Sequence, residues 1–153
     1  MGISKEYDDL NQQEKDFVFW HPIAALNFRS NSKTAIEEAK KRFNYATRHN
    51  GSIDAFRHCY WSALNARDQG PELAKQFGDA KKSRSDNPEN EKKMDLHNNA
   101  VGYSIGQFMN GASDRHLAVL CVQAWAAGKL IQIDTSAPGD LTYSNKYEKV
   151  YEQ

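Results

Sequence analysis

Residues 50–65 read NGSIDAFRHCYWSALN, and this stretch decides the fold because it predicts one long helix with two faces of different chemistry. Its apolar residues recur at the three-to-four spacing of a buried helical face. They are Ile53, Phe56, Tyr60, Ala63 and Leu64. Reactive side chains recur at the same spacing, beside the apolar stripe. They are Asp54, His58, Trp61 and Asn65. A polar face ordered like a core face indicates a functional site or a buried polar network.

The length and composition predict one folded domain. The chain has 153 residues, of which 39% are hydrophobic and 11% aromatic, enough for a core. We expect residues 1–153 to form a single domain, with residues 1–10 as a flexible segment and residues 146–153 as a loose tail. Two cysteines are too few for a disulfide framework, so Cys59 and Cys121 are interpreted as buried free thiols, with a bridge as the alternative.

Charge and hydropathy limit the partners. Twenty basic and twenty acidic residues cancel, so net charge does not support nucleic acid as a partner. Apolar runs are shorter than the ~20 residues of a spanning helix, so we expect no transmembrane segment. The cluster at residues 17–20, FVFW, is interpreted as core, with a membrane-docking wedge as the alternative. No signal peptide is recognised after Met1, so export is expected to need a specialised secretion system.

Turn and cap residues divide the first half of the chain into short helices. Asn11 predicts the start of a helix over residues 12–20, and Pro22 opens a second one. A third helix is expected over residues 35–43. Two serines offer its start, Ser30 and Ser32.

The central helix is expected to begin at a Ser52 cap and to end near Gly70, after which Pro71 opens the next helix. Residues 83–90, SRSDNPEN, predict an exposed connection. Helical periodicity returns from residue 91 to residue 109. Its expected core positions are Met94, Val101, Ile105 and Phe108.

The last third of the chain predicts a close helix contact and a small hairpin. Gly102 and Gly106 share one side of their helix, where a missing side chain permits close approach of another backbone. The last helix is expected from Ser113 or Asp114 to a C-terminal Gly128. Apolar and polar residues then alternate over residues 130–134, and residues 141–143 are expected to pair with them across a turn at Pro138-Gly139. The fold class expected is mainly α: a single compact bundle of five to six helices with at most a small C-terminal β-hairpin.

A second reactive segment, residues 94–102 with the sequence MDLHNNAVG, is expected to face the central helix across the contact at Gly102. Consecutive asparagines are poor helix formers, which indicates that the amides of Asn98 and Asn99 are used. We therefore expect Asp95 and these amides to share a crevice with the polar stripe of residues 54–65.

Such a set of side chains supports general acid-base hydrolysis. His58 takes a proton, Asp95 or Asp54 orients its ring, and Arg57 with the amides stabilises negative charge. The expected substrate-binding residues are Trp61, Asn65, Asn98 and Asn99. A structural network that ties two helices together is the alternative.

A divalent metal ion is the possible cofactor. Asp54 and His58 stand one helical turn apart, and Asp95 or His97 would complete the ligand set. The phosphate-loop glycine pattern, the Gly-x-Ser-x-Gly elbow and the His-Glu-x-x-His zinc helix are absent from the sequence.

The order of motifs resembles an uncharacterised α-helical domain family at the C-terminal ends of bacterial polymorphic toxins, including Rhs-type and wall-associated proteins. The resemblance covers roughly residues 17–145. The motifs that carry it are HPxxA at 21–25, DAFRHxYWSAL at 54–64, FGDA at 77–80, MDLHNNxxG at 94–102, AWxxGKL at 124–130 and LxYSN at 141–145. It implies an antibacterial toxin or effector delivered against a competing bacterium, a bacterial target substrate, and a cognate immunity protein as partner.

The resemblance also implies which residues form the active crevice. They are Arg57, His58, Trp61, Asp95, Asn98 and Asn99. In the family, a His-Glu pair often follows the Asp-Ala of the FGDA motif. This chain has Lys81-Lys82 at that place, so an altered or non-enzymatic relative is the alternative. The predicted central helix, which carries His58, is also similar to the catalytic helix of bacterial phospholipase A2. In that helix an aspartate follows the catalytic histidine, whereas Cys59 follows His58 here. The function expected is hydrolysis of a phosphodiester in lipid or nucleic acid, by an enzyme of the phosphodiesterase or phospholipase class.

Overall fold

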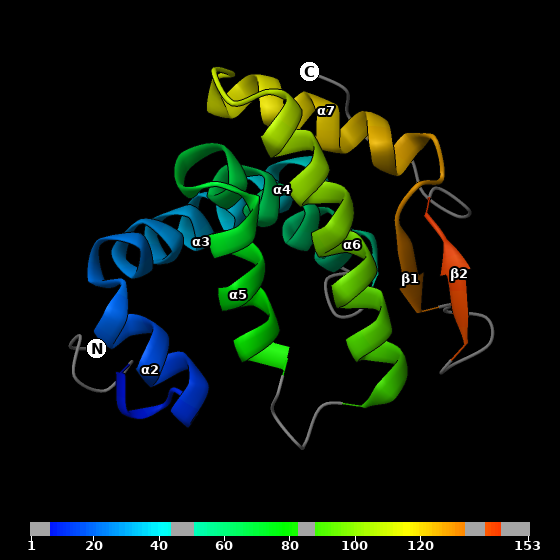
Figure 1. Ribbon diagram of the computed structural model, residues 1–153. Helices are drawn as coiled ribbons and strands as arrows, with labels where there is room; N and C mark the ends of the chain where they lie inside the picture. Colours follow the sequence, from blue (N-terminus) through cyan, green and yellow to red (C-terminus); the bar gives the residue numbers. More distant parts are fainter. Residues whose placement is uncertain (1–6, 44–50, 83–87, 134–139, 145–153) are drawn as a thin grey trace.

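The computed structural model describes residues 7–43, 51–82, 88–133 and 140–144, and within them the chain is mainly α-helical, as the sequence predicts. The helices are α2 (Gln12–Trp20), α3 (Pro22–Arg42), α4 (Ser52–Gln69), α5 (Pro71–Lys82), α6 (Glu89–Phe108) and α7 (Asp114–Ala126). Two short strands, β1 (Ile131–Ile133) and β2 (Leu141–Tyr143), form the expected small hairpin (Figure 1). Several predicted features lie outside the described residues. They are residues 1–6 of the N-terminal segment, residues 83–87 of the connection, the Pro138-Gly139 turn and the 146–153 tail.

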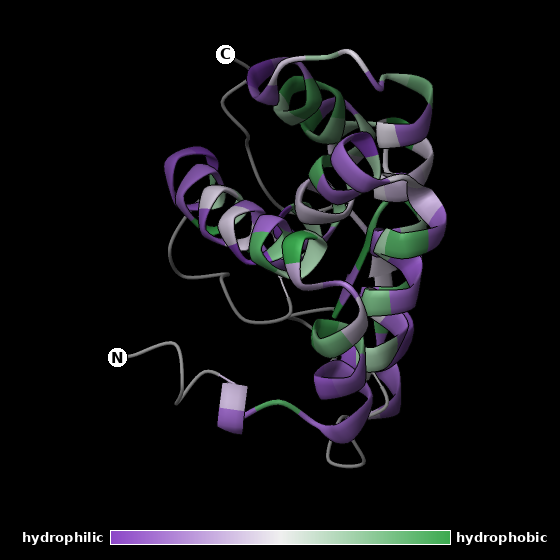
Figure 2. Ribbon diagram, turned by 60° about the vertical axis from the view of Figure 1, so that its left-hand side comes forward, coloured by the Kyte–Doolittle hydropathy of each residue, from purple (hydrophilic) through white to green (hydrophobic). Residues whose placement is uncertain are grey.

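Helix α4 is the centre of the fold. It contacts α3, α5, α6, α7 and β1, and α6 and α7 cross over it in Figure 1. Its predicted apolar stripe is buried throughout, and so is most of the rest of the helix up to Ala66. A helix surrounded by other helices buries polar side chains too, which is why those of α4 need partners. Figure 2 shows apolar ribbon segments turned inward and hydrophilic segments at the periphery.

Helix α3 corrects a prediction, because it is one continuous helix where the sequence predicts two. The serines at 30 and 32 do not restart the helix, and Asn31 between them is buried. The buried residues keep the three-to-four spacing through the whole element. They are Ala24, Phe28, Asn31, Ala35, Ala39 and Arg42. Burial of this continuous stripe outweighs the weak local preference of serine and asparagine for helix ends.

The other helix ends follow the sequence closely. Asn11 caps α2 in a capping box with Glu14, and the Ser113 side chain caps α7. Gly70 and Gly128 have φ angles of 87° and 73°, the left-handed region expected just after a helix. The prediction for Ser52 is wrong, because Gly51 is the N-cap and the Ser52 hydroxyl donates instead to the Gln132 side chain at 3.0 Å.

The hairpin is fastened to the helical body. Ile131 pairs with Tyr143 and Ile133 with Leu141 in an antiparallel register. The Ser144 hydroxyl donates to the carbonyl oxygen of Trp125 at 2.7 Å and accepts from the Leu130 amide at 3.2 Å. These bonds hold the hairpin against the end of α7.

Burial of the apolar residues agrees with the sequence at most positions. Cys59 and Cys121 are free and buried, as predicted. Phe108 is wrong as a core position, because it is 84% exposed at the last turn of α6. In the cluster at residues 17–20, Phe17 is buried whereas Phe19 and Trp20 are each 73% exposed.

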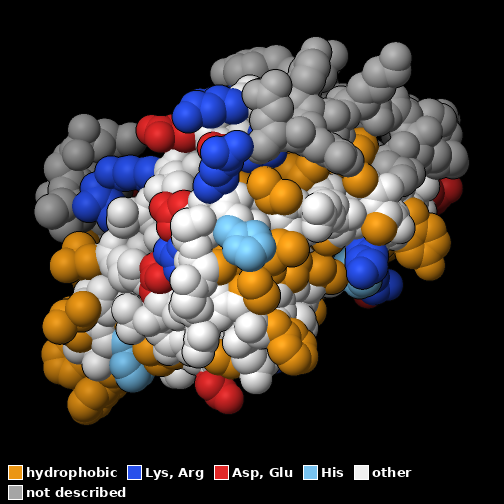
Figure 3. Space-filling model, turned by 90° about the horizontal axis from the view of Figure 1, so that it is seen from above, with side chains coloured by type: hydrophobic (Ala, Val, Ile, Leu, Met, Phe, Trp, Pro, Cys, Tyr) orange, Lys and Arg blue, Asp and Glu red, His pale blue; other side chains and the backbone are white. Residues whose placement is uncertain are grey.

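The surface is mixed in charge. Acidic and basic side chains lie among apolar ones on the face seen from above in Figure 3, in keeping with the equal totals of the two kinds. In the part of the chain that is described, no helix is both long and apolar enough to cross a membrane.

Candidate functional site

The site is built on the contact between α4 and α6, which is the most extensive in the fold. A β-carbon at Gly102 would collide with the carbonyl oxygen of Cys59, and one at Gly106 with the carbonyl oxygen of Ala63. The two backbones therefore touch, as the glycine spacing predicts. Because both residue numbers rise together along the contact, the two helices run in the same direction. His58, next to Cys59 on α4, and Asp95, two turns before Gly102 on α6, are thereby brought close to each other.

His58 of α4 and Asp95 of α6 meet at this contact. Nε2 of His58 lies 3.1 Å from Oδ1 of Asp95, although the residues are distant in the sequence. Their side chains are 13% and 11% exposed, so the pair is largely desolvated but keeps a small solvent-accessible area. The two groups therefore meet across the helix contact, as the sequence predicts; that they share an open crevice stays a prediction.

Arg57 and Asp54 extend the pair into a row of four charged or titratable groups along the helix contact. The Arg57 guanidinium donates from Nη2 to Oδ1 of Asp54 at 3.0 Å, and the same Nη2 lies 3.3 Å from Nε2 of His58. Nε2 cannot donate to Asp95 and accept from Arg57 at once, and the carboxylate is the stronger partner. Assigned in this way, the proton of neutral His58 is on Nε2, and Nδ1 is the basic nitrogen.

A buried polar layer lies one helical turn further along both helices. Asn99 follows Asp95 by four residues and Ser62 follows His58 by four, so each shares a side with its predecessor. Asn99 is 1% exposed and Ser62 is fully buried, yet neither side chain forms a hydrogen bond within the described residues. A buried amide without a partner is uncommon and indicates a group held for another role.

Helix α5 and Tyr103 close this layer. The hydroxyl of Tyr103 occupies the space where a side chain at Gly78 would begin, and Nδ2 of Asn99 lies 3.6 Å from that same position. Burial raises the pKa of Tyr103 to about 12, while the nearby Ser62 hydroxyl lowers it and the charge of Asp79 raises it. The Ser62 hydroxyl is close to the phenol without hydrogen-bond geometry. Ser62, Gly78 and Tyr103 were missed by the sequence analysis, although Ser62 stands one turn from His58.

Trp61 lies on a neighbouring side of α4. Its indole donates to the carbonyl oxygen of Phe28 on α3 at 2.9 Å, and Nζ of Lys81 lies 5.2 Å from the ring centroid. Trp61 also lines a cavity between α2, α3 and α5. Lys81 therefore approaches α4 at Trp61, about one turn from His58.

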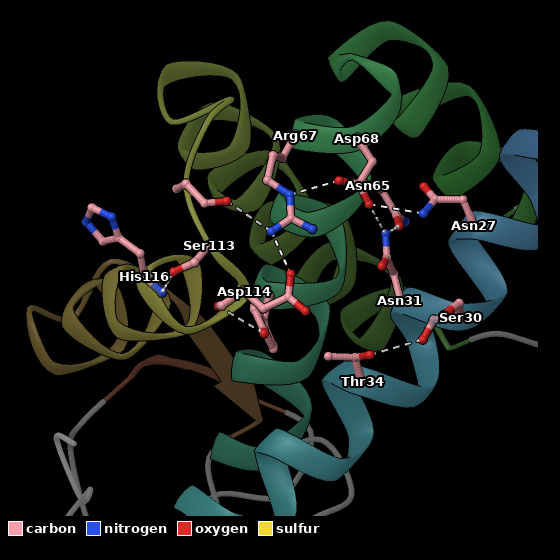
Figure 4. Close-up of polar contacts among 12 residues, drawn as sticks. Asn27, Ser30, Asn31, Thr34, Asn65, Arg67, Asp68, Ser113, Asp114 and His116 are labelled. Atoms are coloured by element: carbon pink, nitrogen blue, oxygen red, sulfur yellow. Dashed lines mark hydrogen bonds and ion pairs between the residues drawn. The ribbon is translucent and has the colours of Figure 1, made fainter.

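Asn65 is placed in a different cluster from His58. Its Oδ1 accepts from Asn31 at 3.0 Å, and Asn31 also donates to Asp68 at 3.0 Å (Figure 4). Arg67 joins this cluster to α7 through Asp114 at 2.6 Å. The amide of Asn65 thus ties α3 to α4, which corrects its assignment to the crevice.

Hydrogen bonds explain the lowered pKa of Asp68 in this second cluster. Burial raises the pKa of Asp68, but hydrogen bonds from Arg67, Asn31 and Asn27 outweigh that effect and leave the pKa lowered. Because the partners of Asp68 come from α3 and α4, its carboxylate is a structural one. No motif in the sequence points to this cluster, and Asn31 only shares the helical spacing of the apolar residues Ala24, Phe28 and Ala35.

Asn98 also departs from the prediction. Its amide donates to the carbonyl oxygen of Ile131 at 2.8 Å and accepts from the Ile131 amide at 2.9 Å. Both ends of the side chain are therefore used to hold β1 against α6. Asn99, not Asn98, is the asparagine left with unused hydrogen-bonding capacity.

The predicted metal set of Asp54, His58 and His97 is not assembled. His97 follows Asp95 by two residues and so points to nearly the opposite side of α6, where its Nε2 lies 2.8 Å from the carbonyl oxygen of Lys129. Among the described residues, no three His, Cys, Asp or Glu side chains are grouped to hold a metal ion.

Comparison with known proteins places the chain in a family without an assigned activity. No solved structure matches the chain. The model of a family described as a domain of unknown function, DUF6973, matches residues 15–129, which run from α2 through α7. The match includes Asp54, Arg57, His58 and Asp95, which together are called the His58 cluster. Because this match covers most of the chain, the protein belongs to the DUF6973 family.

Proposed function

We propose that the protein is a small helical hydrolase in which His58 is the general base and Asp95 orients it. The observation that carries the proposal is the 3.1 Å contact between His58 Nε2 and Asp95 Oδ1 across two helices in backbone contact. A histidine held by a carboxylate keeps one tautomer and one ring orientation, which is what proton transfer requires. Both side chains keep a small exposed area, through which water can reach the pair.

The chemistry follows from the assigned tautomer. Nδ1 of His58 takes a proton from water as the water oxygen attacks the electrophilic centre, and Asp95 stabilises the resulting imidazolium through Nε2. The imidazolium then returns the proton to the leaving oxygen as its bond to that centre breaks. No step is routed through a metal ion, because the predicted ligand set does not come together.

The anion-stabilising groups favour a phosphodiester substrate. The Arg57 guanidinium lies beside the imidazole and offers a fixed positive charge to a phosphoryl oxygen. Asn99 adds an amide with unused donors one turn behind Asp95. Access to Asn99 requires α5 to shift, because Asn99 is 1% exposed.

The biological setting proposed is that of an antibacterial toxin or effector domain. It rests on the order of motifs that resembles bacterial polymorphic toxins, and it carries with it delivery by a specialised secretion system and neutralisation by a cognate immunity protein. The kind of molecule damaged in arrested cells distinguishes a lipid phosphodiester from one in nucleic acid.

A structural or binding module is the second candidate, and the two asparagines favour it. Asn65 and Asn98 both serve helix or strand packing, so polar residues of this interface do hold the fold together. The phospholipase alternative has less support, because Cys59, where that helix carries aspartate, is completely buried at the contact with Gly102.

Expression in bacteria, with and without export to the periplasm, tests the proposal. We expect growth arrest by the wild type in one compartment, with damage to DNA, RNA or phospholipid in the arrested cells, and no arrest by His58→Ala at equal folded protein level. The double variant Lys81→His, Lys82→Glu tests whether the family pair restores or raises activity. Absence of harm from both the wild type and the double variant in both compartments would count against the toxin proposal.

The stability of purified His58→Ala separates the two candidates. A hydrolase loses activity with a modest change in stability, whereas a helix-tying network loses about 3–5 kcal/mol, because the largely buried Asp95 carboxylate loses the imidazole that holds it across the two helices. Chemical denaturation of wild type and variant measures the difference.

A further inference from the structure

A cavity separate from the His58 cluster lies between α2, α3 and α5, with Trp61 of α4 in its wall. Its volume is about 480 Å³, which falls within the range of about 300–1,000 Å³ usual for small-molecule sites. Its apolar wall comes from residues on all four helices. They include Val18, Ala25, Leu26, Phe28, Trp61 and Phe77. His58 and Asp95 are not part of this lining.

The cavity wall has both aliphatic and aromatic side chains, which suits an acyl chain. Phe28 is fully buried and packs against Phe77 in a tilted arrangement, with the ring centroids 5.5 Å apart, so this side of the cavity is aromatic and closely packed. Leu26 is 59% exposed and Tyr7 is 41% exposed, so the cavity opens to the surface between α3 and the chain before α2. A chain that entered there would exchange water for apolar contacts along its length.

Charge at the cavity is mainly positive. Arg29, Lys33 and Lys81 line it, against the single carboxylate of Glu14. Glu14 is 1% exposed and is tied to the start of α2 by the capping box with Asn11. Lys33 is exposed, and its ammonium therefore suits an anionic group at the surface end of a ligand. Nζ of Lys81 lies 5.2 Å from the Trp61 ring and 6.0 Å from the Phe77 ring, which places a second cation beside the apolar wall.

We propose that this cavity binds a single-chain anionic amphiphile of the fatty-acid class, with the acyl chain against Phe28, Trp61 and Phe77 and the carboxylate toward Lys33. An apolar wall with cations beside it is complementary to that chemistry. The inference does not depend on the proposed hydrolysis, because none of the groups of the His58 cluster lines the cavity.

Binding of dodecanoate to the whole chain, below its micelle concentration, tests the proposal. Isothermal calorimetry is expected to give one site per chain. A brominated analogue is expected to quench tryptophan fluorescence in the Trp20→Phe variant, which keeps Trp61 in the cavity wall and Trp125, a buried residue outside the lining. Octanoate should bind more weakly by on the order of a hundredfold, because it buries fewer methylene groups. Dodecyltrimethylammonium, of the same length and opposite charge, should bind at least about tenfold more weakly than dodecanoate.

Two matched pairs of variants locate the site. Leu26 lines the cavity whereas Ile23, one turn earlier on α3 and 79% exposed, does not. Leu26→Asp should weaken dodecanoate binding at least about tenfold, and Ile23→Asp should leave it unchanged. Lys33→Glu should weaken it about tenfold, whereas Lys40→Glu, further along the same helix and outside the lining, should not.

Three results would overturn the proposal. They are absence of binding below the micelle concentration, equal binding of the cationic amphiphile, and equal loss in Ile23→Asp and Leu26→Asp. The last of these would assign the affinity to the exposed apolar corner around Phe19, Trp20 and Ile23. Thermal melts of all variants confirm that they are folded. His58→Ala should bind dodecanoate like the wild type, so that failure of the hydrolase proposal and failure of this one are distinguishable.

Discussion

Asn98 and Asn99 are adjacent in the sequence, yet their side-chain amides differ in hydrogen bonding. Asn98 makes two hydrogen bonds to the backbone of Ile131, whereas the amide atoms of Asn99 have no partner in the described part of the chain. The sequence predicts that both amides are used, because two asparagines weaken a helix. It could not predict which partner each takes, since β1 lies more than thirty residues further on. Asn98 holds β1 against α6, whereas the amide of Asn99 keeps hydrogen-bonding capacity that a substrate could use once α5 shifts.

Replacing each asparagine by leucine separates these roles. Asn98→Leu should lower the free energy of unfolding by about 1–3 kcal/mol, because it leaves the amide and carbonyl of Ile131 without partners. Asn99→Leu should leave stability unchanged or raise it, because it removes two buried polar atoms that have no hydrogen bond. Urea denaturation of both variants measures the effect. A larger loss in Asn99→Leu than in Asn98→Leu would contradict the assignment.

The cysteines allow a second test at this scale. Burial raises the pKa of the Cys121 thiol well above its ordinary value, and the neighbouring Cys59 thiol raises it further. Both thiols are completely buried, so reaction with Ellman's reagent should be negligible in the folded protein and rapid in guanidinium chloride. Rapid reaction of either thiol in buffer would show that the α4–α7 contact opens readily.

At the scale of the elements, the contact between α4 and α6 determines the site. Glycines four residues apart let the sequence predict this close approach, and the meeting of His58 with Asp95 follows from it. The same local reasoning failed for α3, where Ser30 and Ser32 resemble helix starts. A single sequence does not show that Asn31 is buried against Asn65, and that tertiary contact keeps α3 continuous.

Substituting the first glycine tests the contact. In Gly102→Ala the added methyl group would meet the Cys59 carbonyl, which is backbone and cannot move aside cheaply. We expect a loss of about 1–3 kcal/mol in the free energy of unfolding, despite the higher helix propensity of alanine. Gly111→Ala is the control, because no atom lies within 4 Å of its added methyl group. A Gly102→Ala variant as stable as the control would show that the helices are further apart.

At the scale of the whole molecule, the single mainly α fold was predictable because most of its helix ends are marked by local residues, such as Asn11, Gly70 and Ser113. The polar interior was not predictable in detail. The sequence places Asn65, Asn98 and Trp61 in one expected crevice, but Asn65 and Trp61 bond to α3, whereas Asn98 bonds to β1. Partner choice depends on the assembled bundle, which periodicity does not describe.

Alkaline pH tests the bundle as a unit. Burial raises the pKa of Tyr103 to about 12 and also raises that of Tyr60, whereas both ionise near 10 in the unfolded chain. Above pH 10 the unfolded state therefore binds fewer protons, and the free energy of unfolding should fall as pH rises. Tyr103→Phe should make this fall shallower, and Tyr143→Phe, at a 70% exposed position, should not. Denaturation midpoints between pH 9 and 11 measure it; identical curves for wild type and Tyr103→Phe would contradict burial of the phenol.

The imidazole of His58 offers the most direct measurement of the central claim, because its nitrogens report whether Asp95 holds it. Nitrogen-15 NMR of the neutral ring should show the proton on Nε2 in the wild type, since Nε2 lies 3.1 Å from the Asp95 carboxylate. In Asp95→Asn the amide can donate to Nε2, and the proton should move to Nδ1. A wild-type ring protonated on Nδ1, or nitrogen shifts that do not respond to Asp95→Asn, would contradict the pairing on which the proposed chemistry rests.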